Sequence, residues 1–170
     1  MNNLPWMTNK EIQLIEKHIS SNSVVFEYGS GSSTQWFSRI VLDIDSVEHN
    51  KEWFEKVKES LSKNANANIF FVPPVEGWEN PVGTDGSYQF FEKYVEFPKT
   101  TNKNYTFFLI DGRARVSCCQ FITQNYPDAI IAFHDFNNRC NDRIHFYENA
   151  LQFVDVIETA DSLAIMKKKS

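Results

Sequence analysis

Short apolar runs alternate with polar, amphipathic stretches along most of the chain. Five runs are typical of strands: residues 23–28, 44–48, 69–72, 105–110 and 129–133. Several of them are apolar at nearly every position, as strands are when both faces of a parallel sheet are covered. Stretches with apolar residues at helical spacing lie between them. This alternation predicts a parallel sheet with helices on both faces.

The last part of the chain departs from that alternation. Two further strands are predicted at residues 153–157 and 163–166, separated only by residues 158–162. This connection is too short for a parallel crossover, so the last strand is predicted to be antiparallel. The predicted fold class is therefore α/β: a Rossmann-like, doubly wound sheet of seven strands, mostly parallel, with the last strand antiparallel. The expected helices cover residues 8–20, 33–39, 50–61, 90–95, 115–125 and 139–151.

The 170 residues are the size of one domain, in which we expect the N-terminal helix to precede a core at residues 23–168. Thr8 and Glu11 have the spacing of a capping box at the start of that helix.

The net charge of −5 argues against broad electrostatic binding of nucleic-acid phosphates. No apolar run is long enough to span a membrane, and the N-terminus lacks the pattern of a signal peptide. The cysteines include an adjacent pair, Cys118 and Cys119, a poor basis for disulfides, so we expect buried reduced thiols and a cytoplasmic protein.

A glycine turn at residues 23–34 carries the first candidate chemistry. An apolar run ends in Glu27, and Gly29, Gly31 and three hydroxyl residues at 32–34 follow. Glycines at a strand-to-helix turn let the backbone approach a ligand closely, as at the opening of a nucleotide-binding βα unit. One of the three hydroxyl side chains is expected to cap the helix that follows.

Two acids indicate which nucleotide this turn would hold. Thr34 replaces the third glycine of the dinucleotide fingerprint, and Glu27 would repel a pyrophosphate but attract a cation such as a methionine amino group. Glu48 follows Gly29 by nineteen residues, at the end of the second strand, where a carboxylate accepts hydrogen bonds from ribose hydroxyls. An adenosine with a cationic amino-acid tail is S-adenosylmethionine (SAM). The same features argue against a nicotinamide-dependent oxidoreductase.

Residues 25–34 and 45–50 together resemble the first two motifs of the class I SAM-dependent methyltransferases. In that family the acid and the glycines of the first motif hold the methionine end, and the acid after the second strand holds the ribose. The resemblance implies the same roles here. The expected cofactor-binding residues are Glu27, Gly29, Gly31, Ser32, Ser33, Thr34, Glu48 and Asp111.

Two later segments resemble a small group of O-methyltransferases, some of them glycan-directed, that carry D-G-R and H-D signatures. They are residues 108–115 (Phe-Leu-Ile-Asp-Gly-Arg-Ala-Arg) and residues 131–136 (Ile-Ala-Phe-His-Asp-Phe). Asp111, His134 and Asp135 end two buried strands, where ligands bind in open α/β sheets, and they are the catalytic candidates.

These three residues are compatible with two mechanisms. His134 could take the acceptor's proton as a general base, with Asp111 or Asp135 orienting the ring or the acceptor. Alternatively, the resemblance to catechol-type and sugar O-methyltransferases implies Mg²⁺ held by Asp111 and Asp135, with Asn137 or His134 as a third ligand. That family places a second acid or amide beside the acid of the fifth strand, whereas His134 and Phe136 flank Asp135 here.

The predicted function is methyl transfer from SAM to an oxygen of a sugar, a glycan or another small hydroxyl-rich acceptor. Arg113, Asn137 and Arg139 are the expected acceptor-binding residues. The long loop at residues 74–88 should follow the third strand and contribute as a lid, or a second subunit of a homodimer should complete the site. The alternative is a catalytically inactive scaffold that binds SAM or another nucleotide.

Overall fold

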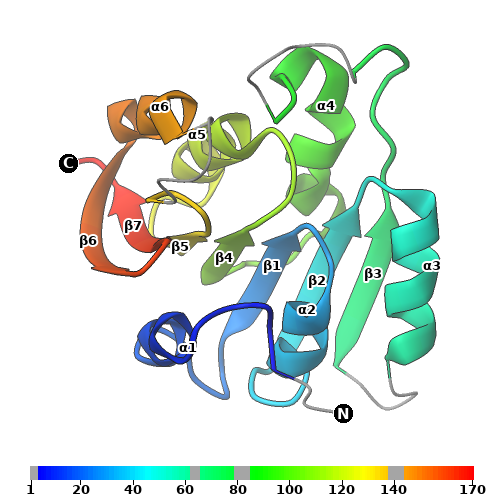
Figure 1. Ribbon diagram of the computed structural model, residues 1–170, viewed down its shortest axis with the longest axis horizontal. Helices are drawn as coiled ribbons and strands as arrows, with labels where there is room; N and C mark the ends of the chain where they lie inside the picture. Colours follow the sequence, from blue (N-terminus) through cyan, green and yellow to red (C-terminus); the bar gives the residue numbers. More distant parts are fainter. Residues whose placement is uncertain (1–3, 62–65, 79–84, 138–143) are drawn as a thin grey trace.

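The computed structural model describes residues 4–61, 66–78, 85–137 and 144–170. Its strands are β1 (Val24–Tyr28), β2 (Asp43–Glu48), β3 (Ala67–Phe71), β4 (Phe107–Ile110), β5 (Ile130–Phe133), β6 (Val154–Ala160) and β7 (Leu163–Lys168). They form one seven-stranded sheet in the order β3-β2-β1-β4-β5-β7-β6 (Figure 1).

The strand pairing confirms the predicted doubly wound topology. The pairs β2–β3, β1–β2, β1–β4 and β4–β5 are parallel, whereas β7 runs antiparallel to both β5 and β6. The chain leaves β3 at one edge and returns to the middle of the sheet as β4, so the strand order reverses between β1 and β4. Open α/β sheets bind their ligands at the carboxyl ends of the strands beside such a reversal.

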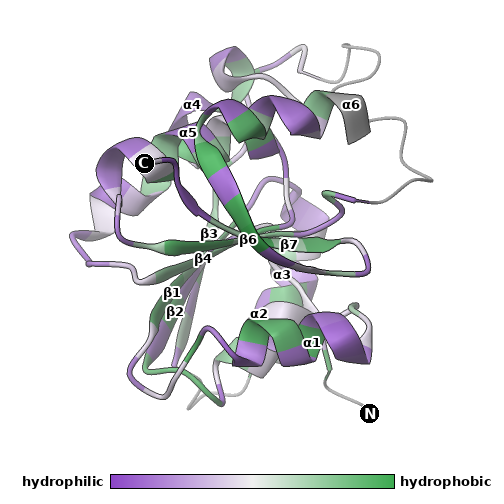
Figure 2. Ribbon diagram, turned by 90° about the vertical axis from the view of Figure 1, so that its left-hand side faces the viewer, coloured by the Kyte–Doolittle hydropathy of each residue, from purple (hydrophilic) through white to green (hydrophobic). Residues whose placement is uncertain are grey.

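Helices cover both faces of the sheet (Figure 2). The α-helices are α1 (Asn9–Glu16), α2 (Ser32–Phe37), α3 (Lys51–Ser60), α4 (Tyr88–Val95), α5 (Arg115–Asn125) and α6 (Ile144–Tyr147), and two 3₁₀ helices, Phe97–Thr101 and Glu148–Gln152, follow α4 and α6. The first three α-helices lie on one face of the sheet and α4, α5 and α6 lie on the other (Figures 1 and 2).

The two helix layers explain why the central strands are apolar on both sides. Phe26 and Phe108 belong to the core beneath α4 and α5, whereas Val25 and Leu109 belong to the core beneath α1 and α2. Neighbouring residues of one strand thus point into opposite cores. Cys118 and Cys119 lie in α5 as buried free thiols, which confirms their expected place in the core.

The first helix is shorter than the predicted span of residues 8–20. Its capping box is confirmed: the Thr8 backbone N–H donates to Glu11 Oε2 (2.8 Å), and the Glu11 N–H donates to Thr8 Oγ1 (3.2 Å). The helix ends at Glu16 because a serine-rich turn competes with it, in which the Ser20 N–H donates to Ser23 Oγ (2.9 Å).

The polar helix predicted over residues 139–151 is also different in the structure. Residues 144–147 form a single α-helical turn, which tightens into the 3₁₀ helix at 148–152, and residues 139–143 lie outside the described part of the chain. In the four described ranges, no helix is both long and apolar enough to cross a membrane.

Candidate active site

The glycine turn after β1 packs directly against the turn after β4. Gly29 has a φ of +96°, and a Cβ placed on it would lie only 2.7 Å from the Cα of Gly112. A glycine is therefore required at position 29 both by its backbone conformation and by its neighbour. A Cβ on Gly31, by contrast, would meet only Ser33 Oγ, at 3.8 Å. No described neighbour demands glycine at position 31, which leaves its surface free for a ligand.

Glu27 lies at the centre of a buried hydroxyl network behind this turn. Its side chain has no exposed surface. Ser33 Oγ donates to Oε1 (2.5 Å), and Thr34 Oγ1 (2.5 Å) and Ser46 Oγ (2.7 Å) both donate to Oε2. Burial raises the pKa of Glu27 to about 7 from an ordinary value of 4.5, although the three hydroxyl donors oppose that shift. The carboxyl group thus ties β1 and β2 to the start of α2.

The helix cap predicted among the three hydroxyl residues is not there. The N-cap of α2 is Gly31, which carries no capping side chain, and Ser32 is the first residue of the helix. Ser33 and Thr34 are the second and third residues of the helix, and their hydroxyl groups donate to Glu27. Thr34 Oγ1 also accepts from the Gly31 N–H (2.9 Å).

Glu48 ends β2 and holds the outer side of the same turn. Its Oε1 accepts from the backbone N–H groups of His49 and Asn50, each at 2.8 Å. Its Oε2 accepts from Ser30 through the backbone N–H (3.2 Å) and the side-chain hydroxyl (3.3 Å). Trp53 completes the contact by donating from Nε1 to the Ser30 carbonyl (2.7 Å). Three backbone donors make Glu48 part of the loop's framework, a role the sequence did not indicate.

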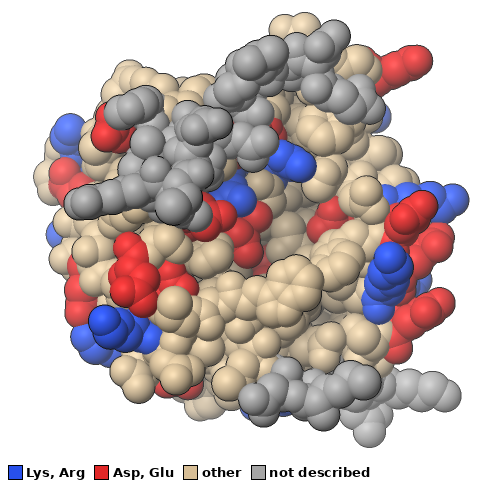
Figure 3. All heavy atoms as spheres, viewed as in Figure 1, with Lys and Arg blue, Asp and Glu red and all other residues tan. Residues whose placement is uncertain are grey.

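A cavity of about 360 Å³ opens beside Glu48, lined by Glu48, His49, Asn50, Glu52, Trp53, Lys56 and Arg113. Its volume lies within the range of about 300–1,000 Å³ that is usual for small-molecule sites. The guanidinium of Arg113 lies 5.4 Å from the centre of the Trp78 ring and has no acidic partner in the described part of the chain. Figure 3 shows this face of the molecule hollowed near its centre, with acidic and basic side chains around the hollow.

The three catalytic candidates meet at the ends of β4 and β5. His134 Nδ1 lies 2.9 Å from Asp111 Oδ1 and 3.8 Å from Asp135 Oδ2. Asp135 has a φ of +59°, a left-handed conformation that is uncommon for a residue other than glycine and that concentrates at functional sites. The structure therefore brings together the three residues that the sequence proposed.

Arg115, the first residue of α5, contacts all three residues of this cluster. The sequence analysis gave it no role. Its Nη1 donates to the His134 carbonyl (2.7 Å) and lies 3.3 Å from Asp135 Oδ2, its Nε donates to the Gly112 carbonyl (3.0 Å), and its Nη2 lies 3.6 Å from Asp111 Oδ1. One buried guanidinium thus connects the turn after β4 with the turn after β5. The signal available in the sequence was the spacing of four residues from Asp111, together with a cation in the first turn of a helix, where the helix dipole opposes it.

Glu11 is a second participant that the sequence analysis missed. Besides capping α1, it accepts from Ser162 in the β6–β7 turn through Oε1, from the N–H at 2.9 Å and the hydroxyl at 2.6 Å. Its Oε2 lies 3.8 Å from His134 Nε2. Burial alone would lower the pKa of His134, but the hydrogen bond to Asp111 and the charges of Asp111, Asp135 and Glu11 outweigh it, and the pKa is raised above its ordinary 6.5.

The same cluster is the candidate metal site. Donor atoms of Asp111, His134 and Asp135 all lie within 4.8 Å of one another. As arranged, however, both carboxylates already face the guanidinium of Arg115, and the His134 nitrogen nearest to them is hydrogen-bonded to Asp111. A divalent cation would have to displace these partners, so the donor set does not fit Mg²⁺ as it stands.

The expected acceptor residues are only partly described. Asn137 is half-buried, and its backbone N–H donates to the Ser162 carbonyl (3.2 Å), which ties the turn after β5 to the β6–β7 turn. Arg139 lies outside the described residues, and so do residues 79–84 of the predicted lid. The end of that loop is anchored, because Asp85 Oδ2 accepts from the backbone N–H of Arg115 (3.0 Å).

No protein-family model matches the sequence, and no curated protein matches it. Solved structures do resemble it. A methyltransferase-like protein from Silicibacter pomeroyi has a TM-score of 0.74 and 21% identity, over 98% of this chain and 88% of its own. A precorrin-6y C5,15-methyltransferase from Geobacter metallireducens has a TM-score of 0.57 and 12% identity, over 98% of this chain and 91% of its own. A TehB-like SAM-dependent methyltransferase from Corynebacterium glutamicum has a TM-score of 0.55 and 10% identity, over 94% of this chain and 88% of its own. At these identities the likeness shows the fold, which is the Rossmann-like fold of SAM-dependent methyltransferases.

Proposed function

We propose that this protein transfers the methyl group of SAM to an oxygen of a sugar or another small, hydroxyl-rich acceptor. One observation carries the proposal. The glycine turn and Glu48 lie at the same edge of the sheet as the Asp111–His134–Asp135 cluster, on the two sides of the strand-order reversal. A cofactor bound across that reversal would place its reactive end near the cluster.

The adenosine half is assigned to the cavity beside Glu48. The ribose hydroxyls would donate to Glu48 Oε2, whose present bonds to Ser30, at 3.2 and 3.3 Å, are the longest that this carboxylate makes. The methionine half would lie over Gly31 and Ser32. Glu27 would not contact the methionine half directly; its buried carboxyl group fixes the conformation of the turn that does.

His134 is the proposed general base. SAM would supply a methyl group activated on a positively charged sulfur. Asp111 holds the Nδ1–H of the imidazole, which leaves the lone pair on Nε2 to take the acceptor's proton as the new O–C bond forms and the S–CH3 bond of SAM breaks, releasing the demethylated thioether. Glu11, whose Oε2 lies 3.8 Å from Nε2, would stabilise the resulting imidazolium. The raised pKa makes His134 a stronger base than a free imidazole, and a pKa nearer to the working pH favours proton transfer.

We assign the acceptor to Arg113 and Asn137, and from the sequence also to Arg139, which lies outside the described residues. The preference for a sugar or glycan comes from the resemblance of the D-G-R and H-D segments and from the polar composition of residues 137–143. The described strands form one sheet. The acceptor would bind at its ligand edge, either to these residues alone or also to a second subunit of a homodimer.

A scaffold without catalysis is the second candidate. It is favoured by the internal pairing of the catalytic candidates, because Asp111 and Asp135 both face the guanidinium of Arg115 and His134 is hydrogen-bonded to Asp111.

Calorimetry separates these proposals. SAM and its demethylated product should bind, whereas NAD should not. Methyl transfer is then assayed with radiolabelled SAM against a panel of sugars, nucleotide sugars and glycans. Binding of SAM without transfer to any acceptor would favour the scaffold. Absence of SAM binding would refute both the enzyme and the SAM-binding scaffold.

A further inference from the structure

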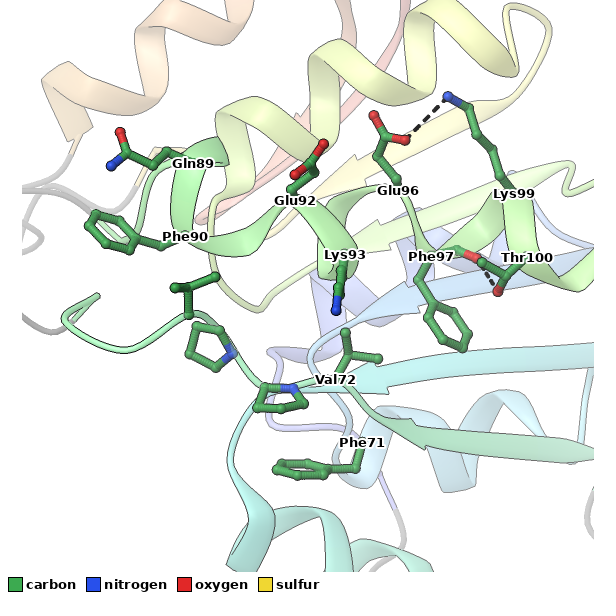
Figure 4. A pocket seen from close by; sticks show the side chains of 13 residues that line it. Phe71, Val72, Gln89, Phe90, Glu92, Lys93, Glu96, Phe97, Lys99 and Thr100 are labelled. Atoms are coloured by element: carbon green, nitrogen blue, oxygen red, sulfur yellow. Dashed lines mark hydrogen bonds and ion pairs between the residues drawn. The ribbon is translucent and has the colours of Figure 1, made fainter.

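A second cavity lies away from the proposed cofactor site. It has a volume of about 870 Å³ and lies between the segment that follows β3, residues 71–75, and the face of α4 with the start of the 3₁₀ helix at 97–101 (Figure 4). It shares no lining residue with the cavity beside Glu48. A separate ligand could therefore occupy it.

The walls of this groove are apolar and well anchored. Phe71, Val72, Val75, Phe90 and Phe97 line it, and Phe71 and Val75 are 37% and 61% exposed. The Val72 N–H donates to the Glu48 carbonyl (2.8 Å), and the Val75 N–H donates to the Phe90 carbonyl (2.9 Å). The segment after β3 is thus fixed both to the sheet and to α4, and exposed apolar side chains on a fixed wall are typical of a binding surface.

One cation points into the groove. Figure 4 shows the Lys93 side chain directed between the two walls, whereas Glu92 and Glu96 point away from the cavity. Glu96 is already engaged by Lys99 (3.5 Å) and by the Tyr88 hydroxyl (2.6 Å). Lys93 has no acidic partner among the residues that the structure describes. Glu92, Glu96 and Lys99 also belong to the lining, but Lys93 is the charged side chain directed between the apolar walls.

The backbone of the wall argues against an added peptide strand. Pro73 and Pro74 follow one another along it, and neither has an N–H group to donate. Recognition of an extended peptide depends on such main-chain hydrogen bonds. A small molecule with an apolar body needs none of them.

We propose that this groove binds a small amphipathic organic anion, with its apolar body between Phe71, Val75 and Phe90 and its carboxylate on Lys93 Nζ. This goes beyond the proposed methyl transfer and does not depend on it. The class includes medium-chain fatty acids and arylalkanoic acids.

Decanoate, below its micellar concentration, is the probe. Decan-1-ol and decyltrimethylammonium have the same apolar chain without the negative charge. Titrations of ¹⁵N-labelled protein followed by NMR are expected to move the amides of Val75, Gln89 and Lys93 with decanoate. Lys93→Gln should weaken decanoate binding about fivefold, the upper end for a partly exposed ion pair, and leave decan-1-ol unchanged.

Two variants complete the test. Val75→Glu places a like charge on an exposed wall position, where folding is not at stake, and should also weaken decanoate. Lys51→Gln removes an exposed lysine of α3 and should have no effect. SAM binding by calorimetry should be the same in all three variants, so failure at the groove and failure at the cofactor site are distinguishable.

Three outcomes would overturn the proposal: equal affinity for decanoate and for either control chain, shifted amides outside the groove, or unchanged decanoate binding in Lys93→Gln.

Discussion

The buried carboxyl group of Glu27 should make the stability of the protein depend on pH. Its pKa is about 7 in the folded protein against an ordinary 4.5. Between these values the folded state keeps the proton that the unfolded chain has lost, so stability falls as pH rises. At about 1.4 kcal/mol per pH unit, the free energy of unfolding should fall by about 3 kcal/mol between pH 4.5 and pH 8 on account of this group alone.

Glu27→Gln isolates that contribution, because the other titrating groups are shared with the parent protein. At pH 4.5 the protonated carboxyl group donates one hydrogen bond, whereas the glutamine amide has two N–H donors. One more of the surrounding hydroxyls must then accept, so the variant should be less stable than the parent at this pH. The assay is urea unfolding followed by circular dichroism at pH 4.5, 6, 7 and 8. The free energy of unfolding of the parent, relative to that of the variant, should fall by about 3 kcal/mol over this range. A change below about 1 kcal/mol would refute the pKa assignment and the buried network that explains it.

Three other predictions follow from the site. Glu48→Gln should weaken SAM binding in calorimetry by about 1.5–3 kcal/mol, and should lower the melting temperature too, since Glu48 also holds backbone N–H groups; full affinity in the variant would remove Glu48 from the ribose site. Methyl transfer should survive exhaustive chelation but drop at least ~100-fold in His134→Ala, whereas loss on chelation with recovery on adding Mg²⁺ would favour a metal mechanism. Gly29→Ala should destabilise the protein by about 1–3 kcal/mol in urea unfolding because of its positive φ and its contact with Gly112; Gly31→Ala is the matched control, and equal losses in the two would argue against a tight turn at Gly29 alone.

The strand layout was readable from the sequence because both faces of the central strands are buried. Val25 and Phe26 belong to different cores, so the run is apolar without interruption and cannot be mistaken for an amphipathic helix. The positions of Asp111 and His134 followed from the same logic, because the residue after a buried parallel strand must emerge at the ligand edge.

The partners of those side chains could not be read in the same way. Ser33 and Thr34 have the composition of a helix cap, yet Glu27 takes both hydroxyls because burial leaves it no solvent to bind. Arg115 and Glu11 reach the site only through the packing of α5 and α1 against the strand ends. No local pattern specifies such contacts, and the capping box was a sufficient explanation of Glu11 from the sequence alone.

The contact between Glu11 and Ser162 joins residues 151 positions apart in the chain. Closing so large a loop has a high entropic cost, which is recovered only when the β6–β7 hairpin has paired with β5. The Glu11 side chain therefore cannot be fixed near His134 while the sheet is incomplete. The glycine turn and Glu48 come from neighbouring strands early in the sequence. The surroundings of His134, by contrast, depend on the contact between Glu11 near one end of the chain and Ser162 near the other, so they should be among the last parts of the protein to become ordered.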